Sequence, residues 1–155
     1  MSAYIAVIGS GEVDDTQRFV AEEVGAGLAA AGHVVVTGGL GGVMEAASRG
    51  AKSHRGQTVG LLPGDSRDDA NGWVDVAIAT GLGELRNGLI VRTVDAVVAI
   101  AGGPGTLSEI GLALKLGRPV VGLDTWDVAG VEVAADPADA VARIAAHIRR
   151  TSDAN

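Results

Sequence analysis

The sequence contains no cysteine, which excludes disulfide bonds, thiolate metal sites and a cysteine nucleophile. Its three histidines, His33, His54 and His147, are scattered and lack the spacing of metal ligands, so we expect no bound metal. There is no cluster of lysine and arginine, and the formal net charge is −7. We therefore expect no DNA or RNA partner, because nucleic-acid polymers require a basic surface.

Long apolar runs are also missing. No stretch approaches the roughly 18 to 20 apolar residues that a membrane span requires. Residues 1–9 reach glycine after one short apolar run, without the charged start and cleavage site of a signal peptide. We expect a cytoplasmic protein with no membrane partner.

Short β-branched runs alternate with longer segments rich in alanine and leucine, which is typical of repeated βαβ units around a parallel sheet. The predicted strands are residues 3–8, 33–37, 58–62, 74–78, 96–100 and 119–123. The predicted helices are residues 14–31, 43–53, 84–94, 106–116 and a last one starting at 136–137. The pattern predicts an α/β fold, a three-layer, doubly wound (Rossmann-like) parallel sheet in a single domain of residues 1–150, with a flexible tail at 151–155.

Local signals refine these helices. Gly32 is expected to end the first helix, since glycine readily adopts a left-handed backbone there. Asp136 followed by Pro137 predicts the start of the last helix. Thr106 and Glu109 have the T-x-x-E spacing of a capping box, which predicts a helix start at Thr106.

Three strands end in glycine-rich turns, at residues 9–11, 38–42 and 102–105. Parallel strands end on the same rim of a sheet, so we expect the three turns to lie together. Glycine lets backbone N–H groups approach a phosphate at a helix N-terminus. Tight turns between strand and helix also need glycine, so each turn alone leaves both interpretations open. Three turns on one rim favour a site for a phosphorylated, nucleotide-like molecule.

Two common nucleotide motifs are absent. Gly9 and Gly11 match two glycines of the G-x-G-x-x-G dinucleotide motif, but Asp14 stands in place of the third. A P-loop is excluded, because Lys52 and Ser53 follow alanine where that motif requires glycine.

Two charged residues stand next to the predicted turns. Arg86 falls in the first turn of its helix, where the helix dipole is unfavourable to a cation. It could contact a phosphate, or form an ion pair with Glu84 or Asp95. Glu109 could cap its helix, bind ribose hydroxyl groups or act in acid/base catalysis.

Residues 101–109, Ala-Gly-Gly-Pro-Gly-Thr-Leu-Ser-Glu, resemble the P-G-G-x-G-T-x-x-E motif of the Lonely Guy family, once labelled lysine decarboxylase-like. Ala101 replaces the first proline of the motif and Pro104 fills its variable position. Segments 9–10, 37–44, 59–63, 86–87 and 95–96 follow in the family's order, so the resemblance covers nearly the whole chain. Arg86-Asn87, where the hydrolases usually carry Arg-Lys, is more similar to the branch of the molybdenum cofactor carrier proteins.

The resemblance implies two alternative functions. The first is a binding or carrier protein for a phosphorylated, nucleotide-like ligand, with the molybdenum cofactor as a candidate. The second is a phosphoribohydrolase that releases base and ribose 5-phosphate from a nucleoside 5′-monophosphate, with Arg86 and Glu109 as catalytic residues. The resemblance also implies a homodimer or homotetramer. The candidate ligand-binding residues are Gly9, Ser10, Gly11, Thr37, Gly38, Gly39, Gly41, Gly42, Arg86, Asn87, Gly102, Gly103, Gly105, Thr106 and Glu109.

Overall fold

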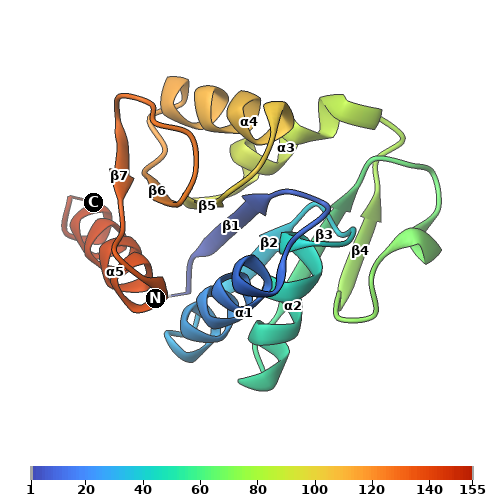
Figure 1. The fold of residues 1–155 in the computed structure, drawn as a ribbon, viewed down its shortest axis with the longest axis horizontal. Helices are drawn as coiled ribbons and strands as arrows, with labels where there is room; N and C mark the ends of the chain where they lie inside the picture. Colours follow the sequence, from blue (N-terminus) through green and yellow to red (C-terminus); the bar gives the residue numbers. More distant parts are fainter. Residues whose placement is uncertain (1, 155) are drawn as a thin grey trace.

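The computed structural model describes residues 2–154 and consists of alternating strands and helices (Figure 1). The elements in chain order are β1 (Tyr4–Gly9), α1 (Asp15–Ala30), β2 (Val34–Thr37), α2 (Val43–Ser53), β3 (Thr58–Leu62), η1 (Arg67–Asp69), β4 (Val76–Ala79), η2 (Gly83–Leu85), α3 (Arg86–Thr93), β5 (Ala96–Ile100), α4 (Pro104–Lys115), β6 (Val120–Leu123), β7 (Val131–Val133) and α5 (Pro137–Asp153). The two η elements are single turns of 3₁₀ helix.

All the strands join one parallel sheet in the order β4-β3-β2-β1-β5-β6-β7. The chain builds outwards from the central β1 to β4, and then crosses back to place β5 on the other side of β1. The strand order therefore reverses between β1 and β5, where doubly wound sheets bind their ligands. Gly9 lies opposite Ile100, so these two strands end side by side.

Helices cover both faces of the sheet. In Figure 1, α1, α2 and α5 lie on one face and α3 and α4 lie on the other. Val7 of β1 packs in the core that contains Leu28 of α1, and its neighbour Ile8 packs in the core that contains Ile110 of α4. Both side chains of such a pair are buried, which explains why the inner strands are apolar throughout rather than alternating. The predicted three-layer α/β fold is confirmed.

Several predicted boundaries agree with the structure. α2, β3 and β5 have the predicted bounds. Gly32 has a φ of +84° immediately after α1, as a helix-ending glycine does. Asp136 accepts a hydrogen bond from the Asp139 N–H at 2.8 Å and so caps α5.

Other boundaries were predicted wrongly. The three-residue edge strand β7 was missed, because it is short and only partly buried. The helix expected at 84–94 begins as the 3₁₀ turn η2 and becomes α-helical at Arg86. α5 continues to Asp153, three residues into the segment expected to be a flexible tail. Within residues 2–154, no helix has the length and apolar character needed to cross a membrane.

Candidate functional site

The glycine turns after β1, β2 and β5 meet at the reversal point of the sheet, because these strands are neighbours in the order β2-β1-β5. A cleft of about 260 Å³ lies there, between the strand ends and helices α3 and α4. Ten of the fifteen predicted site residues line it: Gly9, Ser10, Gly11, Gly38, Arg86, Asn87, Gly103, Gly105, Thr106 and Glu109.

The other five predicted site residues, Thr37, Gly39, Gly41, Gly42 and Gly102, lie outside the cleft lining. Thr37 is buried, and its hydroxyl accepts a hydrogen bond from the Gly39 N–H at 3.1 Å. A methyl group on Gly42 would press against the Ser10 carbonyl oxygen, and one on Gly102 would press against Thr106. Both glycines also have positive φ, of +64° and +99°. These residues shape the turns that carry the lining residues.

The glycines that line the cleft fall into two classes. Gly9 and Gly38 are required by packing: a methyl group on Gly9 would collide with the Ile100 carbonyl oxygen, and one on Gly38 would lie 2.7 Å from an Arg86 nitrogen. Gly11 and Gly103 are different, because a methyl group there would meet no described atom within 4 Å beyond the adjacent residues. On Gly105 a methyl group would meet only the Asn87 amide nitrogen, at 3.8 Å.

Neither steric crowding nor backbone conformation therefore explains why glycine is present at these three positions. We call Gly11, Gly103 and Gly105 the open glycines. None of Gly11, Gly103 and Gly105 has positive φ. Their missing side chains leave free backbone at the wall of the cleft, where a ligand can approach the main-chain N–H groups closely.

Arg86 begins α3 and is 9% exposed. Its guanidinium donates hydrogen bonds to the Asn87 side-chain oxygen and, at 3.4 Å, to the Gly38 carbonyl oxygen. Its Nε is buried without a partner among the described residues. Asp95, one of the two ion-pair partners considered from the sequence, instead accepts from the Tyr4 N–H at 2.8 Å. Arg86 thus lines the cleft and has one buried donor atom that no described residue satisfies.

Glu109 does not form the predicted capping box. α4 begins at Pro104 with Gly103 as its N-cap, so Thr106 is the third helical residue and Glu109 lies one turn further on. Glu109 is 6% exposed, and its Oε2 is buried without a partner among the described residues. Burial raises the pKa of Glu109 to about 7, although the positive charge of Arg86 acts in the opposite direction. Burial likewise lowers the pKa of Arg86, and Glu109 opposes that shift.

The helix N-termini near the cleft differ in what they can bind. At α1, the Asp14 side chain accepts from the Gln17 N–H at 2.7 Å and the Gln17 side chain accepts from the Asp14 N–H, so this end is already capped by a carboxylate. At α4, the N-cap is glycine and no side chain caps the first turn. The start of α4, unlike that of α1, is therefore free to bind an added anion.

Sequence reasoning missed the apolar part of the site. Met44 of α2 and Ile90 of α3 line the cleft, together with Val7 and Ile8 of β1. These side chains resemble ordinary core residues in the sequence, and only the helix positions reveal that they reach the cleft. They give the site an apolar part in addition to its polar residues, as is usual in small-molecule sites.

The model of the SLOG cluster4 family matches residues 2–151. The chain belongs to this family. A relative, an uncharacterised protein of Archaeoglobus fulgidus, is 46% identical over 138 residues, which are 88% of this chain and 91% of the relative. The SLOG cluster4 assignment thus rests on nearly the full length of the chain.

Two solved structures are closely similar. The molybdenum cofactor binding protein of Rippkaea orientalis has a TM-score of 0.90 and 38% identity, with 96% of this chain and 98% of the other covered. The molybdenum cofactor carrier protein of Chlamydomonas reinhardtii has a TM-score of 0.88 and 36% identity, with 96% and 99% covered. The predicted resemblance to the Lonely Guy superfamily, nearest to the carrier branch, is confirmed.

Proposed function

We propose that this protein binds a phosphorylated, nucleotide-like small molecule in the cleft between β1 and β5, and that it carries the molybdenum cofactor without transforming it. The observation on which this proposal depends is the set of three open glycines, Gly11, Gly103 and Gly105. They line the cleft although neither packing nor positive φ requires glycine there. A ligand that lies directly on the backbone explains them.

The phosphate is proposed to lie at the start of α4. Pro104 has no N–H, but the N–H groups of Gly105 and Thr106 have no partner within the helix, and the helix dipole favours an anion. The Asn87 side chain lies near Gly105, and Arg86 extends from the same turn of α3. Arg86 supplies the positive charge beside the phosphate.

The choice of the molybdenum cofactor as cargo is supported by the comparisons. Two proteins with this fold and more than a third of identical residues are described as binding or carrying it. The cofactor is a phosphorylated pterin, and it therefore needs what this cleft offers: an anion site at a helix N-terminus beside an apolar wall.

One observation favours hydrolysis as a second candidate. Glu109 and Arg86 share the cleft, and a carboxyl group with a pKa near 7 suits general acid/base catalysis at neutral pH. In that case Glu109 would assist departure of the base from a nucleoside 5′-monophosphate, and Arg86 would bind the phosphate.

The deciding experiment incubates the pure protein with a panel of nucleoside 5′-monophosphates and, separately, with a molybdenum cofactor preparation. Chromatography detects released base, and thermal denaturation detects binding. The carrier proposal expects stabilisation by the cofactor and no base release. Base release that is lost in Glu109→Gln would replace it with the hydrolase. The cytoplasmic location and the homodimer or homotetramer stay predictions, and light scattering measures the latter.

A further inference from the structure

A second hollow adjoins the cleft on the rim of the sheet. Its volume is about 540 Å³, and it lies over the end of β5, between the segment that follows β1 and the segment that follows β6. Ser10 and Gly103 line both spaces, so a ligand in the cleft can extend over Gly103 into the hollow.

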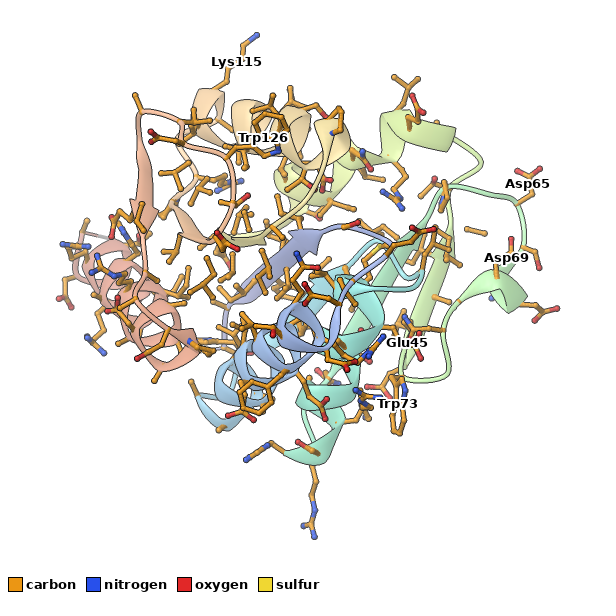
Figure 2. All side chains as sticks on the ribbon, in the orientation of Figure 1. Glu45, Asp65, Asp69, Trp73, Lys115 and Trp126 are labelled. Carbon is orange, nitrogen blue, oxygen red and sulfur yellow. The ribbon has the colours of Figure 1, made fainter. Side chains whose placement is uncertain are left out.

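The hollow has an aromatic wall held in place by hydrogen bonds. The Trp126 indole donates from Nε1 to the Gly103 carbonyl oxygen at 3.0 Å, and the Thr125 hydroxyl donates to the Ala101 carbonyl oxygen at 2.6 Å. Trp126 nevertheless remains 40% exposed. Figure 2 shows it beside α4, at the loop between β6 and β7. A ring fixed at one edge and open on its surface suits stacking against a flat ligand.

The charged side chains that line the hollow are all acidic, whereas the cleft contains Arg86 as well as Glu109. Glu12, after β1, and Asp124, after β6, contribute carboxylates, and no lysine or arginine is among its lining residues. Such a hollow disfavours a phosphate. It favours a ring that presents hydrogen-bond donors, because an ionised carboxylate only accepts.

We infer that this hollow is a second subsite, which binds the ring of the ligand while the start of α4 binds its phosphate. The chemistry that fits is a flat ring with a 2-amino-4-oxopyrimidine edge, common to guanine and pterins. That edge presents a ring N–H beside an exocyclic amino group, and one carboxylate accepts from both. Adenine lacks this pair of donors. The inference rests on the proposed function and adds which class of ring the site selects.

The test uses the two tryptophans of the chain. Trp73 lies near β4, far from Trp126 in Figure 2, and Trp73→Phe leaves Trp126 as the one fluorescent indole. This variant is titrated with GMP, IMP, AMP and neopterin monophosphate, while thermal denaturation reports binding independently. GMP and IMP differ in the 2-amino group alone, and the neopterin arm distinguishes a pterin from a guanine as the preferred ring.

The inference expects quenching of Trp126 fluorescence by GMP or neopterin monophosphate, with an affinity about tenfold or more above that for IMP and AMP. The preference for GMP over IMP should disappear in at least one of the variants Asp124→Asn and Glu12→Gln, and in the double variant. Trp126→Leu, which lacks the reporter indole and is therefore followed by thermal denaturation, should lose the preference for GMP over IMP, and Trp126→Phe should restore part of that preference. Equal stabilisation by GMP, IMP and AMP without any change in fluorescence would overturn the inference and leave the proposed function standing. No binding of any of the four would also overturn the inference, and titration with the cofactor preparation would then decide the proposed function separately.

Discussion

Glu109 of α4 and Arg86 of α3 lie on neighbouring helices that line one cleft, each more than nine-tenths buried, and they interact electrostatically. Each also has one buried polar atom, Oε2 of Glu109 and Nε of Arg86, that no described residue satisfies. Buried polar atoms are normally hydrogen-bonded, so two unsatisfied atoms on residues that line one cleft support the proposal that a ligand binds there.

The first prediction concerns stability and pH. The folded pKa of Glu109, about 7, lies above its ordinary value of 4.5. Its contribution to the free energy of unfolding is therefore complete below pH 4.5 and is lost as the pH rises through 7. Relative to Glu109→Gln, the wild-type protein should lose on the order of 3 kcal/mol between pH 4.5 and 8. Urea denaturation of both proteins across this range measures the difference. If the free energy of unfolding had the same pH dependence in both proteins, the raised pKa of Glu109 would be contradicted.

The second prediction concerns pH and binding. Ionised Glu109 adds a negative charge beside the phosphate, so affinity for a nucleoside monophosphate or the cofactor should fall as the pH rises through 7. The Glu109→Gln variant should not show this fall, which separates Glu109 from titration of the phosphate itself. Calorimetric titration at pH 6, 7 and 8 measures the affinity of both proteins. The same dependence of affinity on pH in both would refute the effect of ionised Glu109 on binding.

The third prediction separates the two classes of glycine. Gly105 and Gly111 are both exposed residues of α4 with room for a methyl group, but only Gly105 lines the cleft. Alanine at either position should stabilise the helix by up to about 1 kcal/mol. Gly105→Ala should also weaken ligand binding about tenfold or more, since one misplaced methyl group costs roughly 1–3 kcal/mol in a close contact. Equal affinity in Gly105→Ala and Gly111→Ala would remove the main support for the site.

Packed glycines should behave in the opposite way. Gly9→Ala places a methyl group against the Ile100 carbonyl oxygen and the Val43 side chain. This overpacking should lower the free energy of unfolding by roughly 1–3 kcal/mol or more, because backbone has little freedom to move. Thermal denaturation without ligand measures it, and a Gly9→Ala protein as stable as the wild type would show that the β1 turn is looser than the structure indicates.

The fifth prediction concerns Arg86. Arg86→Lys keeps the positive charge but loses the planar group that donates to both the Gly38 carbonyl oxygen and the Asn87 side chain. Affinity for a phosphorylated ligand should fall about tenfold to a hundredfold, as expected for lost charge-assisted hydrogen bonds. Arg118→Lys serves as the control, because Arg118 follows the C-terminal end of α4 and does not line the cleft. Similar affinities in the two variants would show that Arg86 acts through charge alone.

The sequence was sufficient to predict the parallel sheet and the meeting of three glycine turns. Both follow from patterns within short segments, such as the apolar run of β5 and the glycines after it. The capping box at Thr106 and Glu109 was wrong, because Pro104 can occupy the first position of a helix and so allowed α4 to begin earlier. The contact of Trp126 with Gly103 was not predicted either. It joins residues 23 positions apart, through a loop whose path depends on the packing of β6 beside β5.

The most direct test of the carrier proposal is equilibrium dialysis of the protein against a molybdenum cofactor preparation, with retained molybdenum measured by mass spectrometry. The account predicts saturable retention by the wild type and by Gly111→Ala, weaker retention by Gly105→Ala, and loss of retention when the preparation is first treated with phosphatase. Equal retention in all three proteins, or retention that survives removal of the phosphate, would contradict a phosphate site at the start of α4.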